Sequence, residues 1–241
     1  MKRIALITGA NKGLGFETAR QLGAKGIKVL MTARKEDKGK NALETLKGEG
    51  LDVELLPLEI TNENQVNALV QHIKKTYGKL DILVNNAGIM HKGEPGGINT
   101  AEIVSAEVLR ETFDVNFFGL VNLTQKLVPL IKKSDSGRII NVSSILGSNT
   151  IQSDASSPWS GIKPFAYNAS KAALNSFTVH LAAALKEANI KVNSAHPGWV
   201  KTDLGGQNAP LEATDGAKTS VILASADFTG KFVHYEEEIA W

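Results

Sequence analysis

The sequence contains no cysteine, which excludes disulfides, thiolate metal ligands and a cysteine nucleophile, and which is typical of a reducing compartment. No apolar run approaches the roughly 20 residues of a membrane span. The first run, residues 4–7, is too short for the core of a signal peptide. Basic and acidic residues are balanced, 27 against 25, so the concentrated basic face of a nucleic-acid-binding protein is missing. We therefore expect a cytoplasmic protein that binds neither membranes nor nucleic acid.

What the sequence does contain is a regular alternation of short apolar runs and amphipathic helical patterns. The apolar runs end at Gly, Asn, Pro or Ser and predict strands near 4–7, 28–31, 53–58, 80–84, 138–142, 191–194 and 231–233. The helical patterns lie near 17–24, 41–47, 66–77, 106–131 and 170–187. Apolar strands that alternate with helices are typical of a parallel sheet covered on both faces. The chain therefore predicts one domain, residues 1–241, with a doubly wound α/β fold of about seven mostly parallel strands.

Two stretches interrupt this alternation. Residues 143–160 are rich in serine and include Pro158, so we expect a long loop between a strand and a helix. Residues 203–213, with two glycines and Pro210, are expected to form a mobile segment that covers a site. Long loops in compact domains are commonly functional, although solvent-exposed padding is the alternative reading.

A glycine-rich turn follows the first predicted strand and opens a helix. Its glycines, Gly9, Gly13 and Gly15, are spaced Gly-x-x-x-Gly-x-Gly, with Asn11, Lys12 and Leu14 between them. Glycines in this context let the backbone approach a pyrophosphate, whose charge then lies at the helix N-terminus. The Gly-Lys-Ser/Thr ending of a P-loop is missing. The turn therefore predicts a bound dinucleotide.

The end of the second predicted strand indicates which nicotinamide cofactor is bound. An NAD-binding protein would carry an acidic residue there to hold the ribose 2′-hydroxyl. This chain instead has Arg34, which is suited to a 2′-phosphate, and Lys12 in the glycine-rich turn is placed to reach the same group. Two solvated surface cations are the alternative, but the pattern favours NADP(H).

A candidate catalytic group combines a helix and a strand end. Tyr167 and Lys171 are spaced i, i+4 and lie on one face of a predicted helix. The neighbouring ammonium is expected to lower the pKa of the phenol and make it a usable acid or base. Ser144 follows the strand at 138–142, at the carboxyl edge of the sheet where ligands bind. Its hydroxyl is expected to donate to an oxygen that gains charge.

In this order, the motifs resemble the short-chain dehydrogenase/reductase family over essentially the whole chain. The matching motifs are Thr8-Gly9-x-x-x-Gly13-x-Gly15, Asn85-Asn86-Ala87-Gly88, Asn116, Ser144, Tyr167-x-x-x-Lys171 and Pro197-Gly198. Within the family the chain most resembles the NADPH-dependent carbonyl reductases, through Thr-Ala-Arg at 32–34 and Asn-Phe-Phe-Gly at 116–119. The resemblance implies a Rossmann fold and an oxidoreductase that transfers hydride between NADPH and a small-molecule aldehyde or ketone.

The resemblance also implies a role for each matching residue. Tyr167 would be the general acid, Ser144 would orient the carbonyl, and Lys171 would bind the nicotinamide ribose. Asn116 would anchor a water that links Lys171 to solvent. The implied cofactor contacts are Gly9, Asn11, Lys12, Gly13, Leu14, Gly15, Arg34, Glu59, Ile60, Asn86, Ala87, Gly88, Tyr167, Lys171, Pro197, Gly198, Val200 and Thr202.

Two positions depart from the family pattern. Glu59 stands where most members have an aspartate that meets the adenine amino group, so that contact is expected to be shifted or bridged by water. Ser144 and Tyr167 are farther apart in sequence than is usual. The extra residues must lie beside the catalytic helix, which other members use to dimerise. The sequence therefore leaves both a monomer and a homo-oligomer open.

The motifs leave alternatives within and outside the class of carbonyl reductases. A 3-oxoacyl-thioester or steroid-type reductase would carry the same motifs, because the substrate loops rather than the motifs differ. A non-catalytic NADP(H)-binding sensor is the alternative from another class. The five histidines are scattered without metal-binding spacing, so no metal site is expected.

Overall fold

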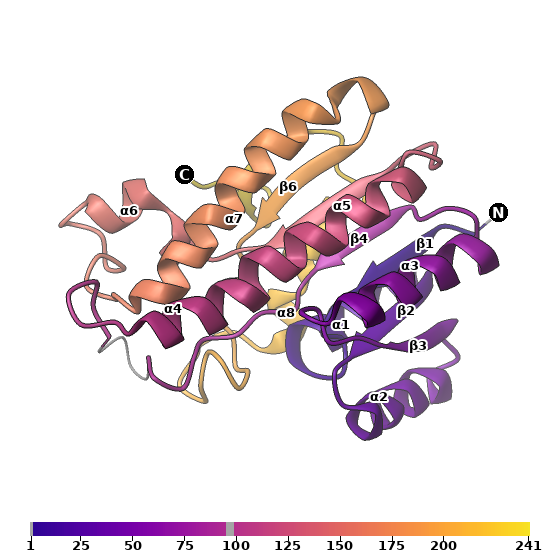
Figure 1. Cartoon of the computed structure of the whole chain (residues 1–241), viewed down its shortest axis with the longest axis horizontal. Helices are drawn as coiled ribbons and strands as arrows, with labels where there is room; N and C mark the ends of the chain where they lie inside the picture. Colours follow the sequence, from indigo (N-terminus) through magenta and orange to yellow (C-terminus); the bar gives the residue numbers. More distant parts are fainter. Residues whose placement is uncertain (1, 95–98) are drawn as a thin grey trace.

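The computed structural model describes residues 2–94 and 99–241, and a sheet runs through the middle of this part of the chain (Figure 1). Its eight described strands follow the order β3-β2-β1-β4-β5-β6-β7-β8. Neighbours from β3 to β7 pair in parallel, and only β8 is antiparallel. The strands are β1 (Ile4–Ile7), β2 (Lys28–Ala33), β3 (Val53–Pro57), β4 (Ile82–Asn85), β5 (Arg138–Val142), β6 (Lys191–Ala195), β7 (Phe232–His234) and β8 (Glu237–Glu238). The predicted doubly wound, mostly parallel sheet is confirmed, with one short edge strand beyond the seven expected.

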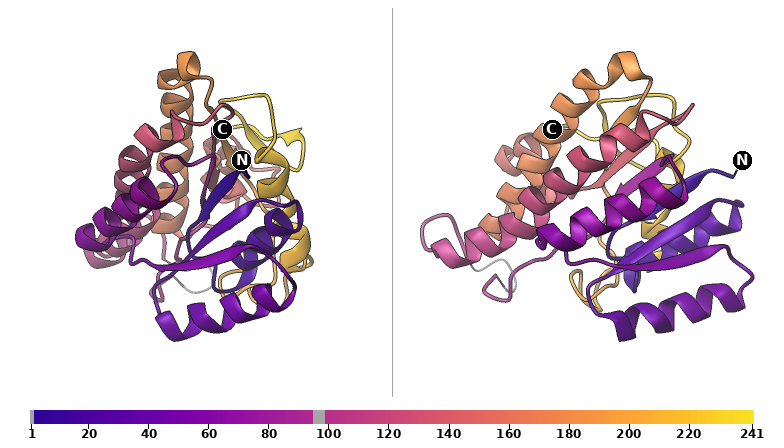
Figure 2. Two further views of the ribbon diagram at one scale, coloured as in Figure 1. Left: turned by 90° about the vertical axis from the view of Figure 1, so that its right-hand side faces the viewer. Right: turned by 45° about the vertical axis from the view of Figure 1, so that its right-hand side comes forward.

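Helices cover both faces of the sheet (Figure 2). One face packs against α3 (Glu63–Thr76), α5 (Leu120–Ile131) and α7 (Phe165–Ala184). The other face packs against α1 (Gly13–Ala24), α2 (Glu36–Gly48) and α9 (Lys218–Leu223). Successive residues of a strand point to opposite faces, so Leu6 joins the first core, while Ala5 and Ile7 join the second. Both faces being buried explains why the strands are apolar throughout.

The remaining helical segments differ from the expected pattern in two places. The predicted helix over 106–131 contains a π-helical segment between its two α-helical parts, because the chain makes one wider turn around Asn116. The predicted loop over 143–160 contains a 3₁₀ turn and a short helix, each begun by a serine side chain that accepts a backbone N–H. The segments are α4 (Ala106–Phe113), η2 (Asp114–Gly119), η3 (Ile145–Gly147), α6 (Asn149–Ser153), η4 (Lys186–Ala188) and α8 (Ala213–Gly216).

The strand order creates the crevice in which the site lies. From β1 the chain moves outward to β2 and β3, and then it returns to β4 on the other side of β1. The connections after β1 and β4 therefore leave the sheet in opposite directions, which opens a crevice at the carboxyl ends of these strands. The glycine-rich turn follows β1, and the segment 86–88 follows β4. Both of these sequence motifs consequently reach the same edge.

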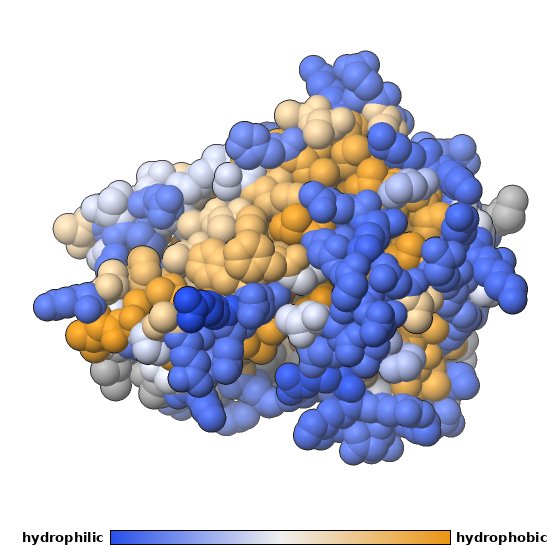
Figure 3. All heavy atoms as spheres, viewed as in Figure 1, coloured by the Kyte–Doolittle hydropathy of each residue, from blue (hydrophilic) through white to orange (hydrophobic). Residues whose placement is uncertain are grey.

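The surface is unevenly polar (Figure 3). Polar residues dominate over α2 and α3, while more apolar residues lie over α5 and α7. Phe118 of η2 and Val179 of α7 are among the large apolar side chains that are exposed. Within residues 2–94 and 99–241, no helix combines the length and the apolar character that a membrane span requires.

Candidate active site

The glycine-rich turn is packed so closely that side chains would not fit at its glycines. Gly9 and Gly13 have φ of 65° and 56°, a conformation that favours glycine. A Cβ on Gly15 would lie 2.4 Å from Nδ2 of Asn86 and 2.5 Å from the backbone oxygen of Gly9. The N-cap residue of α1 is Lys12, and its side chain accepts no hydrogen bond from the first N–H groups of the helix. Such a helix start suits a phosphate, and the turn fits a dinucleotide.

The segment after β4 holds this turn in place. Oγ1 of Thr8 accepts the N–H groups of Asn86 and Ala87, both at 2.9 Å. Nδ2 of Asn86 donates to the backbone oxygens of Thr8 and Gly9 at 2.8 and 3.2 Å. Asn86 thus joins the two motifs on either side of the crevice. It is also one of the residues that line the cavity described next.

A cavity of about 500 Å³ brings together Ser144, Tyr167 and Lys171, three of the four residues predicted to take part in catalysis, and Asn116 does not line it. Ser144 follows β5, whereas Tyr167 and Lys171 lie one turn apart on α7, as their spacing predicts. The Ser144 hydroxyl lies close enough to the Tyr167 phenol to lower its pKa. Oγ of Ser144 also accepts the N–H of Leu146 at 3.2 Å. The predicted cofactor contacts that line the same cavity are Leu14, Asn86, Gly88, Tyr167, Lys171, Pro197, Gly198, Val200 and Thr202.

Burial dominates the protonation of this group. It raises the pKa of the Tyr167 phenol to about 12, and the nearby Ser144 hydroxyl opposes this rise. Burial also lowers the pKa of Lys171 to about 8. Nζ of Lys171 donates to the backbone oxygen of Val142 at 2.8 Å and lies 5.7 Å from the centre of the Tyr167 ring. The predicted fall in the phenol pKa is therefore wrong, because desolvation outweighs the one opposing effect, which comes from Ser144 and not from the ammonium.

Asn116 lies in the π-helical segment η2, next to the cavity wall, and is fully buried. Its Oδ1 accepts the N–H of Ile89 and its Nδ2 donates to the oxygen of the same residue, both at 2.8 Å. Nδ2 also donates to Oγ of Ser170 at 3.0 Å. A Cβ on Gly88 would meet Oδ1 of Asn116 at 3.3 Å and Nζ of Lys171 at 3.4 Å. Asn116 therefore ties the loop after β4 to α7 beside Lys171.

The segment after β6 forms a further part of the cavity wall. Gly198 has a φ of 85°, and Val200 forms a β-bridge with Leu211. Thr202 reaches the glycine-rich turn, since a Cβ on Gly13 would lie 3.2 Å from its Cγ2. Nε1 of Trp199 donates to the oxygen of Gly205 at 2.7 Å. The segment predicted to cover a site thus begins at the cavity wall and carries Leu204, Gly205 and Gly206 in its lining.

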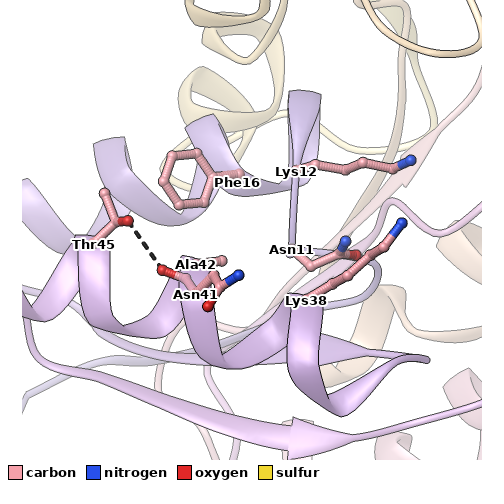
Figure 4. A pocket seen from close by; sticks show the side chains of 7 residues that line it. All are labelled: Asn11, Lys12, Phe16, Lys38, Asn41, Ala42 and Thr45. Atoms are coloured by element: carbon pink, nitrogen blue, oxygen red, sulfur yellow. Dashed lines mark hydrogen bonds between the residues drawn. The ribbon is translucent and has the colours of Figure 1, made fainter.

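A second hollow, of about 340 Å³, lies between α1 and α2 beside the glycine-rich turn (Figure 4). Asn11 and Lys12 are the predicted residues in its lining, and Lys38 was missed by the sequence reasoning. Figure 4 shows the Lys12 and Lys38 side chains extending in the same direction. Lys38 lies in the first turn of α2, four residues after Arg34, and a search for cations in the first turn of the helix after β2 would have found it.

Carboxylates accompany two of the predicted cations. Lys12 forms an ion pair with Asp203, and Nε of Arg34 lies 3.6 Å from Oε2 of Glu59. Glu59 therefore faces the end of β2, while the following residue, Ile60, is buried in the core. All of these charged side chains are at least partly exposed, which leaves them accessible to a phosphate.

Two buried groups near the site were not predicted to act there. Nδ1 of His196 accepts the N–H of Ile145 at 3.3 Å, and burial lowers the pKa of this histidine to about 3. The carboxylate of Glu94 bonds the start of α7. Neither contact leaves a local signal in the sequence, because each joins residues that are far apart in the chain. Among the described residues, no group of three or more His, Cys, Asp or Glu side chains is placed to hold a metal ion.

The fold and the site together define a dinucleotide-dependent oxidoreductase: a doubly wound sheet, a phosphate-binding turn, and a Ser–Tyr–Lys group at the carboxyl edge. The family model for short chain dehydrogenases matches residues 3–212. The chain belongs to the short-chain dehydrogenase family, whose members bind a nicotinamide cofactor.

Individual relatives agree with this assignment. The chain is 36% identical to (+)-neomenthol dehydrogenase of Arabidopsis thaliana, over 92% of this chain and 91% of that protein. It is 34% identical to the NADPH carbonyl reductase 1 of Mus musculus, over 92% and 90% of the two chains. The crystal structure of NADPH-bound carbonyl reductase from chicken fatty liver superposes with a TM-score of 0.86 at 27% identity, over 100% of this chain and 99% of that chain. The resemblance to carbonyl reductases predicted from the motifs is confirmed.

Proposed function

We propose that this protein transfers hydride between NADPH and a small-molecule aldehyde or ketone, and so reduces the carbonyl group reversibly to an alcohol. The observation that carries the proposal is that Ser144, Tyr167 and Lys171 line one cavity with residues from the glycine-rich turn and the segment after β6. The carbonyl reductases among the relatives support it.

The side chains of the site have complementary tasks in this reaction. NADPH, when bound, supplies the hydride. The Ser144 oxygen accepts the N–H of Leu146, so its own hydrogen is left to donate to the phenol or to a carbonyl oxygen. Tyr167 gives its proton to that oxygen as negative charge develops there. A phenol keeps its proton at neutral pH even at its usual pKa near 10, and burial raises the pKa of Tyr167 further, to about 12, so the residue is present in the acid form that the reducing direction requires.

Lys171 and Asn116 support this proton transfer from the protein side. We propose that Lys171 binds the nicotinamide ribose, because its buried ammonium reaches the cavity next to Gly88. Asn116 holds the Ile89 peptide group and Ser170, which keeps the loop after β4 fixed to α7. These contacts let Asn116 act through the position of Lys171.

We propose NADP(H) rather than NAD(H) because several cations surround the place where the adenosine ribose would lie. Lys12 and Lys38 line the hollow between α1 and α2, and Arg34 ends the neighbouring strand. A 2′-phosphate would compete with Asp203 for Lys12 and with Glu59 for Arg34. A phosphate offers more charge than either carboxylate, so cations placed in this way favour the phosphorylated cofactor.

The remaining cavity wall indicates an apolar substrate. Met90, Trp159, Ile162, Trp199 and Leu204 surround the space in front of the catalytic group. Apolar and aromatic walls with a few convergent polar groups are typical of pockets for small organic ligands. We therefore propose compact, apolar aldehydes and ketones as substrates, and a 3-oxoacyl thioester is the competing class in the assay below.

The first experiment measures NADPH oxidation by the purified protein with aromatic aldehydes, diketones, alicyclic ketones and a 3-oxoacyl thioester. The Tyr167→Phe variant is expected to lose about 10²- to 10⁴-fold in kcat, the usual contribution of a general acid. Its Kd for NADPH is expected to stay within about twofold of the wild type, because the phenol proton is not needed for binding. Tyr77→Phe, at the far end of α3, is the matched control. Full turnover in the Tyr167→Phe variant would refute the assigned role.

The cofactor assignment has its own test. Lys38→Ala is expected to raise the KM for NADPH about three- to tenfold, a modest effect because the cation is exposed, and to leave the KM for NADH unchanged. Lys40→Ala, on the same helix but paired with Glu36, is the matched control. A wild-type enzyme that prefers NADH would overturn the 2′-phosphate assignment and leave the reductase activity standing.

A further inference from the structure

The first turn of the catalytic helix lacks a cap of its own. α7 begins at Phe165, and its N-cap residue is Pro164, which makes no side-chain hydrogen bond. The first N–H groups of a helix have no partner within the helix and must be satisfied from outside. Tyr167 is the third residue of this turn. Whatever satisfies the turn therefore also sets the starting position of the proposed general acid.

A remote carboxylate supplies the missing partners. Oε1 of Glu94 accepts the N–H of Ala166 at 2.8 Å, and Oε2 accepts the N–H of Tyr167 at 3.0 Å. The N–H of Phe165 donates to the backbone oxygen of Asn99 at 3.1 Å. Glu94 is fully buried, and the positive end of a helix is a favourable place for a carboxylate. Both of its oxygens are thus committed to the residue that carries the phenol and to its neighbour.

The position of Glu94 is in turn fixed by a tight turn anchored on α4. Its N–H donates to the oxygen of His91 at 2.8 Å. Nδ1 of His91 accepts the N–H of Gly93 at 2.9 Å, and Nε2 lies 3.0 Å from Oε2 of Glu111. Glu111 belongs to α4, so the turn is held from outside the loop. The Glu94 carboxylate therefore has little freedom to follow α7 if the helix moves.

The same loop is attached to α7 at its other end. The Ile89 peptide group is held by Asn116, whose Nδ2 also donates to Ser170 of α7. Between the two attachment points lies Met90, which lines the cavity. The loop from Ile89 to Glu94 is consequently attached to α7 at both ends and lines the cavity between them through Met90.

We propose that Glu94 is a positioning residue for carbonyl reduction: it fixes the first turn of α7 and thereby sets the Tyr167 hydroxyl against Ser144. Ser144 is carried by the end of β5, which pairs with β4 and β6 in the sheet and contacts α7 beyond its first turn, through the hydrogen bond from Lys171 to Val142. A shift of the helix start would therefore change the distance between the two hydroxyl groups. The inference rests on the proposed function, because it concerns the same reaction.

The test compares Glu94→Gln with Glu107→Gln, an exposed glutamate on α4, as the matched control. Glutamine has the same shape as glutamate, but its amide NH₂ replaces one acceptor and faces a backbone N–H. We expect kcat, counted per NADPH-binding site, to fall about tenfold or more, as a displacement below 1 Å would cause. The Kd for NADPH is expected to stay within about twofold. Counting sites by NADPH binding removes any loss of folded protein from the comparison.

A second measurement does not depend on turnover. Amide hydrogen exchange of the peptide containing Ala166 and Tyr167 is expected to rise in Glu94→Gln and to remain at the wild-type level in Glu107→Gln. An unchanged kcat per site with an active wild type, or unchanged exchange, would overturn the inference. A parallel loss of NADPH binding and kcat would also overturn it in favour of a general folding defect. A wild type that reduces no carbonyl would refute the proposed function, and the exchange would then decide whether Glu94 holds the turn.

Discussion

Gly147 provides a sharp test of how closely the catalytic helix must pack against the loop after β5. It lies in η3, three residues after Ser144, and faces the backbone of α7. A Cβ at this position would lie 2.7 Å from the carbonyl carbon and the Cβ of Lys171 and 2.9 Å from the nitrogen of Ala172. These are backbone atoms and the first side-chain carbon, so no flexible side chain can turn away.

The expected magnitude for Gly147→Ala follows from these distances. Ordinary contact begins at 3.4 Å, so η3 and α7 must separate by about 0.7 Å. Overpacking of this kind costs about 1–3 kcal/mol of stability, which corresponds to a fall in Tm of about 2–12 °C for a chain of this size. The separation also moves Lys171 and Tyr167 away from Ser144, and displacements near 1 Å can reduce catalysis about a hundredfold. We expect kcat to fall about ten- to a hundredfold.

The assay is steady-state NADPH oxidation with the best substrate of the panel, normalised to the number of NADPH-binding sites. Gly161→Ala is the matched control, because it lies in the same stretch between β5 and α7 and its added Cβ would meet nothing within 4 Å. The control is expected to keep kcat within about twofold of the wild type. A kcat for Gly147→Ala within that range, together with a lowered Tm, would show that the approach of η3 to α7 does not set the position of the catalytic candidates.

Two further predictions concern buried polar groups. Oγ1 of Thr178 accepts a hydrogen bond from Nδ2 of Asn141 at 2.8 Å, so Thr178→Val leaves a buried donor without its partner. We expect this variant to lose about 1–3 kcal/mol in the free energy of unfolding, measured with urea. Thr76→Val, at an exposed position, is the control, and equal stabilities of the two variants would contradict the prediction. Burial lowers the pKa of Lys171 to about 8 from its usual 10.5, so between these values the unfolded chain holds the extra proton and stability rises with pH. The free energy of unfolding of the wild type minus that of Lys171→Met is therefore expected to increase from pH 8 to pH 10, and a decrease would show the opposite shift.

Much of the fold is encoded locally and is predictable from the sequence. The runs that form β1, β2 and β5 are short and apolar and end at turn residues, so their period identifies them without knowledge of their partners. The glycine-rich turn is predictable for the same reason, since its spacing and its place between a strand and a helix carry the signal. The π-helical segment around Asn116 is not predictable in this way, because its backbone hydrogen bonds span five residues where those of an α-helix span four.

The residues of the site were predictable from the sequence, but their pKa values were not. The membership of the site followed from the motifs, because the carboxyl ends of parallel strands must share one edge of the sheet, and Ser144, Tyr167 and Lys171 meet there. The pKa shifts of these side chains did not follow from the motifs. Spacing alone suggested that the ammonium lowers the phenol pKa. Burial instead raises the pKa of Tyr167 to about 12 and lowers that of Lys171 to about 8. The degree of desolvation depends on everything packed around a residue and is absent from its local sequence.

The sequence by itself therefore determined the family, the fold class and the candidates for the catalytic side chains, because each is carried by residues close together in the chain or by motifs in a fixed order. The tertiary structure decided how these side chains are held. Glu94 meets the start of α7 across 72 residues, Gly147 lets η3 approach Lys171, and Lys38 joins Lys12 beside the glycine-rich turn. Such contacts arise only when distant segments pack against one another, and no spacing in the sequence records them.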